Sequence, residues 1–483
     1  MLFNEPAFLF FLLPFTLALY FIPLRAHRNP LLLIASLIFY AWGEPRFVLV
    51  LLVSFVLNYF MGLWVGRTRE TPHGKRVLAL AVTLNLMILG TWKYANFIVG
   101  NLDSLLGAMG VAPIRLAHIT LPLGISFFTF HAMSYVIDIY RGNARAQRNP
   151  WNIALYLAFF PQLIAGPIVR YKDLAEQLVH RTVTLEGFSW GVQRFILGLG
   201  KKTLIANSVA GPADKIFALP AAQLTAPLAW LGAVCYALQI YFDFSGYSDM
   251  AIGLARMFGF RFPENFNYPY ISASVTEFWR RWHISLSTWF RDYVYIPLGG
   301  NRRRPARVYF NLVTVFFLCG LWHGASWTFV VWGLFHGAFL AFERSTGIGR
   351  EATPSRNPLR HLYLLLVVLV GWVLFRAETI GQAWAFLTTM AGFGHATAPD
   401  QVAAYLNTEV ALALAAGCLA SMPVLPAALR LWRAVCERIP PGVRPAWEAA
   451  SAAAGICCLA ATFALCAAFM AAGTYNPFIY YRF

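Results

Sequence analysis

Charged residues are scarce in this chain of 483 residues, where Asp, Glu, Lys and Arg together make up 12%. Soluble domains carry about 25% charged residues, and here hydrophobic residues reach 59% and aromatic residues 16%. This composition excludes an ordinary soluble domain, which carries far more charge. The 7 cysteines have no metal-ligand spacing, so they predict core packing rather than a zinc site or a disulfide framework.

The signatures of several common enzymes are also missing. The chain has no His-Glu-x-x-His zinc helix. The stretch Gly198–Thr203 resembles a phosphate-binding loop only in part, because Phe195 and Lys202 stand where Gly and Ser or Thr belong. The longest polar stretches, 344–360 and 430–444, are loop-sized. Any chemistry must therefore be done by the apolar part of the chain.

Long apolar runs dominate that part. A helix of about 20 residues crosses the roughly 30 Å of hydrocarbon in a bilayer. The candidate runs are residues 8–23, 47–65, 77–99, 225–240, 308–342, 362–375, 410–429 and 449–472. The first has no basic stretch before it and no cleavage pattern after it, so we do not expect a signal peptide. We predict an all-α integral membrane protein, one polytopic domain over residues 1–483 with roughly 10–13 membrane segments including re-entrant helices.

The positive charge lies in short loops between these runs. The net charge of +17 raises the question of nucleic-acid binding, but the basic residues alternate with membrane segments instead of forming one patch. Basic loops occur at Arg25–Arg28, Arg67–Arg76 and Arg141–Arg148, and the alternate loops carry little charge. The positive-inside rule then places these three loops in the cytoplasm and the N-terminus outside. No nucleic-acid partner is expected.

Two central segments depart from plain spanning helices. Residues 151–170 contain two prolines and a glycine in an apolar stretch, and residues 277–300 mix apolar with charged residues. Irregular backbone at membrane depth is tolerated only where protein or a water-filled cavity covers it, so both segments are expected around a central funnel. If residues 277–291 form one helix, Glu277 and Arg281 pair at i, i+4, and His283 shares a face with an aromatic stripe.

Histidines in apolar surroundings are the candidate functional residues. His323 lies in the run Leu-Trp-His-Gly-Ala-Ser-Trp, and His283 follows Trp-Arg-Arg-Trp. An ionisable group at membrane depth is costly to hold there and is a functional candidate by default. The alternative for His323 is a core histidine that hydrogen-bonds across helices, and for His283 an interfacial anchor. His131 and His336 also lie in apolar runs, and we interpret both as structural.

A set of uncommon strings then resembles a known family. These strings are Tyr241–Met250 (YFDFSGYSDM), Glu264–Phe266 (ENF), Thr276–Ser287 (TEFWRRWHISLS), Leu298–Arg302 (LGGNR) and Leu321–Gly324 (LWHG). Together with Pro161–Pro167 and the tail Asn476–Phe483, they closely resemble the membrane-bound O-acyltransferases. Within that family the likeness is greatest to the bacterial branch that acetylates exopolysaccharides such as alginate.

The resemblance implies a ring of membrane helices around a thin core, with a catalytic core at about residues 117–345 and C-terminal helices and an aromatic tail at 360–483. It implies acetyl-CoA as the donor substrate, entering from the cytoplasm, with no bound cofactor and no metal. An extracytoplasmic SGNH-type acetyltransferase partner would complete transfer to the polysaccharide. The expected location is the bacterial inner membrane. Whether alginate, cellulose, peptidoglycan or another glycan is the final acceptor stays open.

The same resemblance matches His323 to the family's catalytic histidine and His283 to its second histidine. Acyl transfer to a hydroxyl needs a base that removes the hydroxyl proton, and histidine suits this role. Further candidates would bind the carbonyl oxygen, the acceptor or the phosphates of coenzyme A, or would orient the base: Asn265, Trp282, Trp322, Arg280, Arg281, Arg302–Arg304, Asp243, Asp249 and Glu277.

The tail and the overall function each leave an alternative open. Tyr480 and Tyr481 in the ending Phe-Ile-Tyr-Tyr-Arg-Phe are a possible acyl relay, although an aromatic-belt anchor explains the same residues. A polysaccharide-export or transporter subunit is the alternative to an enzyme. Transporters often contain paired, similarly interrupted halves, and the segments around Pro161 and His283 do not resemble each other.

Overall fold

The computed structural model describes residues 1–22, 27–349, 357–394 and 402–473. Every regular element in these ranges is a helix, and the predicted all-α fold is confirmed. Proline stands in the first turn of α11, α14, α16 and α21, where its missing N–H would have no helical partner anyway.

The helices fall into three groups along the chain. The N-terminal group is η1 (Phe8–Leu12), α1 (Leu13–Tyr20), α2 (Arg28–Gly43), η3 (Pro45–Phe47), α3 (Val48–Thr68), α4 (Gly74–Ala108), α5 (Ile125–Tyr140), α6 (Pro150–Ala158), α7 (Phe160–Leu163) and α8 (Tyr171–Leu174). The central group is α9 (Leu185–Gly200), η4 (Lys201–Ala206), α10 (Asn207–Phe217), η5 (Ala221–Gln223), α11 (Ala226–Met257), η6 (Pro269–Ile271), α12 (Val275–Arg281), α13 (Ile284–Phe290), η7 (Arg291–Tyr295), α14 (Pro305–His323) and α15 (Trp327–Thr346). The C-terminal group is α16 (Pro358–Arg376), α17 (Ile380–Met390), α18 (Val402–Tyr405), α19 (Thr408–Ala420), α20 (Val424–Arg438) and α21 (Arg444–Ala471).

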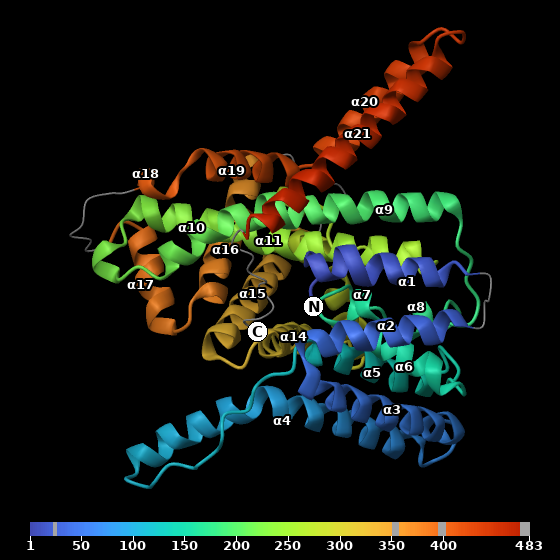
Figure 1. The fold of residues 1–483 in the computed structure, drawn as a ribbon. Coiled ribbons are helices and arrows are strands. Elements are labelled where there is room, and N and C mark those ends of the chain that lie inside the picture. Colours follow the sequence, from blue (N-terminus) through green and yellow to red (C-terminus); the bar gives the residue numbers. More distant parts are fainter. Residues whose placement is uncertain (23–26, 350–356, 395–401, 474–483) are drawn as a thin grey trace.

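Helix α11 forms the centre of the molecule, and nearly all of its side chains are buried. Helix α9 runs along it (Figure 1). The two backbones approach closely at reciprocal glycines: a Cβ added to Gly198 would lie 2.6 Å from the carbonyl oxygen of Gly246, and one added to Gly246 would lie 2.7 Å from that of Gly198. Gly191 and Gly253 repeat this arrangement. Small residues that let backbones approach are a standard way to pack helices in membranes.

The length and apolarity of the helices fit a membrane protein. Among the described residues, six helices are long and apolar enough to span a bilayer, and a seventh span results if the bent pair α19 and α20 counts as one. The predicted 10–13 segments included shorter and broken pieces such as η1–α1, which this criterion leaves out. Figure 1 shows the α20–α21 hairpin and one end of α4 extending beyond the compact part.

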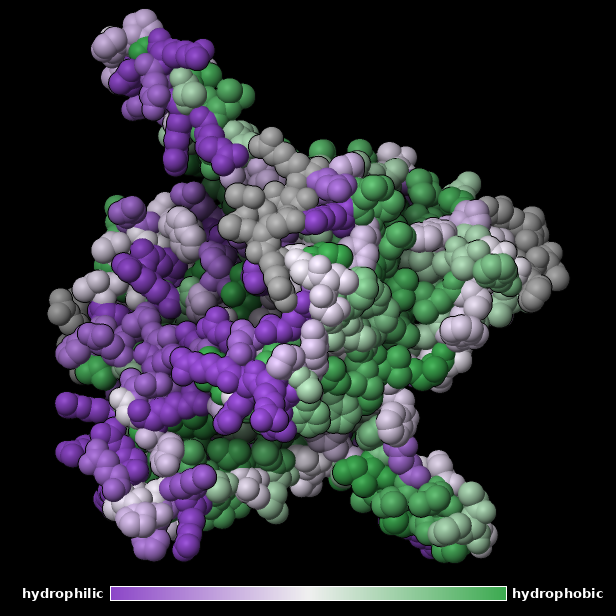
Figure 2. Space-filling view, turned by 180° about the vertical axis from the view of Figure 1, so that it is seen from behind, coloured by the Kyte–Doolittle hydropathy of each residue, from purple (hydrophilic) through white to green (hydrophobic). Residues whose placement is uncertain are grey.

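The basic loops share one end of the molecule. Arg67, Arg69, Arg145 and Arg148 line a common cavity, and Arg28 lines another together with Asn149, Asn152 and Leu178–Thr182. Figure 2 shows hydrophilic side chains gathered at this end and hydrophobic ones over most of the remaining face. We call this the basic end. Its composition agrees with the positive-inside pattern of the sequence.

Of the two irregular segments, the first is covered by protein and the second is only partly buried. Residues 151–170 form the short helices α6 and α7, which break at Phe159, and nearly every residue from 152 to 169 is buried. Residues 277–291 do not form one helix, and this prediction is wrong: α12 ends at Arg281 and α13 begins at Ile284. The break places His283 in a left-handed conformation, with φ of 43°. The predicted pair is present, since Arg281 donates to Glu277 over 2.9 Å.

Candidate active site

His283 and His323 lie side by side in the core. Their ring centroids are 6.5 Å apart, and their exposed fractions are 0% and 6%. One comes from the break between α12 and α13, and the other is the last residue of α14. The sequence predicted both as functional residues, and the fold brings together two histidines that are forty positions apart.

Three of the four imidazole nitrogens of this pair lack hydrogen-bond partners among the described residues. Among the described residues, neither ring nitrogen of His283 nor Nδ1 of His323 has a hydrogen-bond partner. Buried polar atoms are nearly always hydrogen-bonded in native proteins, so each exception calls for an explanation. His283 also adopts positive φ, a backbone conformation that is costly for a residue other than glycine. Unpaired nitrogens and a strained backbone at one place indicate a site built to receive a ligand.

Aromatic side chains enclose both imidazoles. The rings of Trp322, Trp332 and Phe375 have centroids 5.0, 5.1 and 5.1 Å from that of His323. Phe244 lies edge-on to His283 at 4.6 Å, and Trp322 lies 5.9 Å from it. Such walls exclude water, and electrostatic interactions are stronger in a medium of low dielectric constant. Of the two predicted tryptophans, Trp322 therefore belongs to the histidine pair.

Asn265 holds the backbone that carries His283. Its amide oxygen accepts from Ser285 N over 3.2 Å and from Ser285 Oγ over 2.9 Å, and its amide nitrogen donates to Ser248 Oγ over 3.0 Å. Its backbone carbonyl accepts from Ile284 N over 3.0 Å. Asn265 is fully buried and joins α11 to the start of α13. Its role in binding a carbonyl oxygen stays a prediction, but its amide is already committed to this scaffold.

Two side chains of α4 lie against the end of α14 and a third contacts the start of α15, and sequence reasoning missed all three. Lys93 Nζ donates to the backbone carbonyls of Trp322 and His323, and Tyr94 Oη donates to that of Leu321 over 2.7 Å. Further along α4, Asn101 accepts from Trp327 Nε1 over 2.9 Å. A lysine in the middle of the apolar run 77–99 was the signal that could have revealed this contact.

The predicted carboxylates have basic partners elsewhere. Asp243 pairs with Lys202 and Asp249 with Lys201, each over 2.7 Å. Arg194 also pairs with Asp249 over 2.7 Å. Glu277 likewise pairs with Arg281. A role for one of these carboxylates in orienting His323 stays a prediction.

Two predicted binding residues, Trp282 and Arg281, contact groups other than the imidazoles. Trp282 packs against Trp372 with centroids 4.8 Å apart, in an aromatic cluster that includes Phe278. The guanidinium of Arg281 pairs with Glu277 and donates to the backbone carbonyl of Asn267. Roles for Trp282 and Arg281 in donor or acceptor binding remain predictions. Tyr480 and Tyr481 lie outside the described residues.

Two other buried histidines, His131 and His336, also have unpaired ring nitrogens among the described residues, but neither has the positive φ of His283. His336 lies between Trp279 and Trp332, with centroids 5.2 and 5.1 Å away. His131 is on α5 beside Tyr156, and both of its ring nitrogens lack partners among the described residues. Within those residues, no three side chains of His, Cys, Asp or Glu gather in a way that could hold a metal ion.

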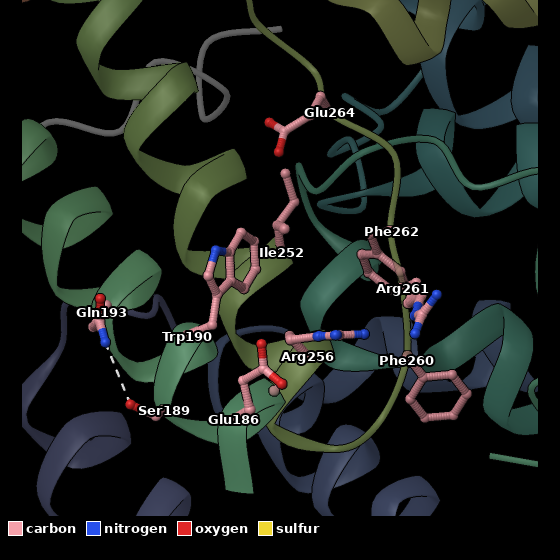
Figure 3. Close-up of a pocket in the computed structure, with 11 residues that line it drawn as sticks. Glu186, Ser189, Trp190, Gln193, Ile252, Arg256, Phe260, Arg261, Phe262 and Glu264 are labelled. Atoms are coloured by element: carbon pink, nitrogen blue, oxygen red, sulfur yellow. Dashed lines mark hydrogen bonds between the residues drawn. The ribbon is translucent and has the colours of Figure 1, made fainter. Parts of the chain in front are cut away.

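Two cavities matter for access. A small one of about 20 Å³ adjoins His323 and is lined also by Lys93, Ser126 and Trp322. A larger one of about 590 Å³ lies between α9, the end of α11 and the loop that follows it, as Figure 3 shows. Arg181, which lines a cavity of the basic end, stacks on Phe260 of the larger cavity at 4.2 Å. The larger cavity therefore opens near the basic end.

The larger cavity mixes guanidinium groups with aromatic rings. Arg256 and Arg261 have no ion-pair partner among the described residues, and Trp190 and Phe262 supply apolar walls. Glu264 also lines it, and its carboxylate is neutralised by Arg194 over 2.6 Å. Glu264 directly precedes Asn265, so one wall of this cavity continues into the scaffold of His283.

Comparison with known proteins decides the family. The model of the membrane-bound O-acyltransferase family matches residues 35–377, a range that includes both histidines. The chain belongs to the membrane-bound O-acyltransferase family. The resemblance to this family that the sequence motifs predicted is thus confirmed over most of the chain. The protein is an O-acyltransferase.

Similar curated proteins support this assignment. "Probable alginate O-acetylase AlgI" of Azotobacter vinelandii is 50% identical over 410 residues, covering 84% of this chain and 81% of that protein. A peptidoglycan O-acetyltransferase of Helicobacter pylori is 37% identical, covering 81% of this chain and 80% of that protein. A teichoic acid D-alanyltransferase of Bacillus subtilis is 31% identical over 45% of this chain and 58% of that protein. The relatives act on different polymers and share an acyl-transfer reaction.

Proposed function

We propose that this membrane-bound O-acyltransferase passes acetyl groups from cytoplasmic acetyl-CoA across the bacterial inner membrane toward an extracytoplasmic exopolysaccharide of the alginate type. The acetyl group and the polymer are supported by the alginate O-acetylase similarity, which extends over more than four fifths of both chains. The orientation is supported by the basic end, which the positive-inside rule places in the cytoplasm.

A second protein completes the transfer in this proposal. The described chain consists of helices and short loops, and its Gly-x-Ser-x-Gly string at Gly187–Gly191 lies inside helix α9 rather than on the strand-to-helix turn of a nucleophile elbow. An extracytoplasmic acetyltransferase of the SGNH type would therefore take the acetyl group from the membrane protein and place it on the polysaccharide. Coenzyme A enters as a substrate in this scheme, and no resident cofactor is invoked.

The observation that carries the proposal is the buried histidine pair with unpaired ring nitrogens. His323 accepts the proton of an acceptor hydroxyl while the hydroxyl oxygen bonds to the thioester carbonyl carbon. The tetrahedral intermediate then collapses, the carbon–sulfur bond breaks, and the proton passes from the imidazolium to the coenzyme A thiolate. His283 lies close enough to His323 to act on the same small group, and its free N–H suits the carbonyl oxygen.

We place the phosphates of acetyl-CoA in the larger cavity near the basic end. Arg256 and Arg261 provide guanidinium groups that form bidentate contacts with phosphate, and Trp190 offers a ring on which an adenine stacks. The double variant Arg256→Gln, Arg261→Gln should raise KM for acetyl-CoA about tenfold at unchanged kcat. An unchanged KM would place the donor elsewhere.

The proposal is tested with purified protein in liposomes that receive labelled acetyl-CoA on one side and the partner's extracytoplasmic domain on the other. Transfer should require His323 and should survive His131→Gln, which alters another buried imidazole. No transfer by wild type with the verified partner would favour the export-subunit alternative. Transfer of a different acyl group in preference to acetyl would keep the reaction class and overturn the donor.

A further inference from the structure

Lys93 is a buried cation whose neighbours are the site itself. It lies on α4 with an exposed fraction of 8%. Nζ donates to the carbonyl oxygen of Trp322, to that of His323 over 3.3 Å, and to Ser126 Oγ over 3.1 Å. The ammonium also lies 5.8 Å from the ring of Trp322. Among the described residues, no carboxylate lies within ion-pair distance of it.

Burying a lysine ammonium at this position costs free energy, and its hydrogen bonds must offset that cost. Moving an ammonium from water into an apolar interior costs several kcal/mol even after relaxation, and lysine within a membrane segment is rare. The three acceptors match its three N–H donors. Its cost is therefore offset by hydrogen bonds to one particular stretch of backbone, the two residues at the end of α14.

The end of α14 needs such donors. The last carbonyls of a helix have no partner within the helix, and the helix dipole places partial negative charge there. After Gly320, whose carbonyl accepts from Gly324 N, the next three carbonyls receive donors from α4 side chains: Leu321 from Tyr94, and Trp322 and His323 from Lys93. A cation at a helix C-terminus is the favourable arrangement of charge.

The chain direction changes just after this contact. Gly324 continues with φ of −164° and ψ of 153°, and a Cβ added to it would lie 2.2 Å from the ring of Phe329. His323 is thus the last residue before a sharp turn, and among the described residues its Nδ1 has no hydrogen-bond partner. The backbone of His323 is fixed instead, because Lys93 donates a hydrogen bond to its carbonyl oxygen.

We propose that Lys93 is a positioning residue for His323, fixing the end of α14 so that the imidazole faces His283. Lys93 acts through the backbone of His323 and does not touch the reacting atoms. The inference rests on the proposed function, because it takes His323 as the base. A displacement of about 1 Å at a reacting group can lower a rate about a hundredfold, so loss of this contact should appear mainly in kcat.

The first test compares graded variants in the acetyl-transfer assay. Lys93→Met keeps the length of the side chain and removes the ammonium; we expect kcat to fall about a hundredfold while KM for acetyl-CoA stays within about twofold. Ser126→Ala removes an acceptor but leaves both carbonyl contacts, so its effect should be about tenfold smaller. Lys75→Met, an exposed lysine on the same helix, is the matched control and should behave as wild type.

Rescue separates positioning from simple structural support. Lys93→Arg restores a cation with N–H donors, and we expect it to recover at least about a tenth of wild-type kcat. Equal kcat in Lys93→Met and wild type would overturn the proposal. So would a Lys93→Met protein in which KM and kcat change together with a large drop in unfolding temperature, because that pattern describes a folding defect.

A second measurement does not depend on the acyl donor. In protein labelled with ¹⁵N-histidine, the His323 resonances are assigned by their loss in His323→Gln. Lys93→Met should shift or broaden them and leave those of His131 unchanged. If wild type transfers no acetyl group but this shift occurs, the proposed function fails and the positioning role stands. Unchanged His323 resonances would overturn the positioning role whatever the assay gives.

Discussion

The two histidines of the site are held in opposite ways. His283 lies at a strained break between two seven-residue helices, where the hydrogen bonds of Asn265 fix the following backbone. His323 ends a 19-residue membrane helix in ordinary conformation, and donors from α4 fix its carbonyl. The strained residue depends on a local scaffold and the unstrained residue on a distant helix. The difference shows that one site draws on both short-range and long-range contacts.

The largest effect is expected at the local scaffold. Asn265→Ala removes hydrogen bonds to Ser285 and Ser248 and leaves buried polar groups unpaired, at about 1–3 kcal/mol each. We predict a loss of transfer activity of about a hundredfold together with a lower unfolding temperature. Ser248→Ala loses a single bond and should be milder on both counts. Equal activity in Asn265→Ala and wild type would mean that His283 does not depend on this scaffold.

Strain at His283 predicts a trade-off between stability and activity. His283→Gly removes the side chain but relieves the cost of positive φ, which is about 1 kcal/mol or more. The variant should therefore lose most transfer activity without becoming less stable, as followed by thermal unfolding in detergent. His131→Gly, in a helix with ordinary conformation, should be less stable. A His283→Gly protein that unfolds more easily than His131→Gly would contradict the role of strain.

A smaller effect is expected where α12 begins. The buried carboxylate of Glu343 accepts from Val275 N, Thr276 N and Thr276 Oγ1 over 2.6–2.8 Å. Replacement by glutamine places an amide N–H against groups that are themselves hydrogen-bond donors. It also removes the negative charge that stabilises the N-terminus of α12. Glu343→Gln should lower the free energy of unfolding by about 1–2 kcal/mol and reduce transfer a few-fold. Denaturant unfolding in micelles measures the first, and unchanged stability would count against the cap.

The smallest effect concerns the basic end, away from both histidines. Burial would raise the pKa of Asp292, but Arg291 and Arg170 outweigh it and hold this pKa below its ordinary value. A carboxyl with a depressed pKa stabilises the fold above the unfolded pKa, and this contribution is lost as pH falls through the folded value. The free energy of unfolding should therefore fall less below about pH 4 in Asp292→Asn than in wild type. Transfer at pH 7 should change little. Identical acid profiles for both proteins would refute this role.

The sequence predicted the helical membrane class because long apolar runs are visible in it. It predicted both histidines as functional candidates because each lies in apolar surroundings. It failed at residues 277–291, where helical periodicity concealed the left-handed residue His283. It also missed Lys93, since one charge in a long apolar run does not alter the average. The sequence suggested Asp243 and Asp249 as neighbours of His323. It could not reveal their ion pairs with Lys202 and Lys201, because these pairs depend on the packing of η4 beside α11.

The central claim is that the buried imidazole of His323 is the base of acyl transfer. The most direct measurement is single-turnover transfer of labelled acetyl from acetyl-CoA in liposomes, comparing wild type, His323→Gln and His131→Gln at equal folded protein. The account predicts a loss of at least about a hundredfold in His323→Gln alone. Transfer by His323→Gln at the wild-type rate would contradict it.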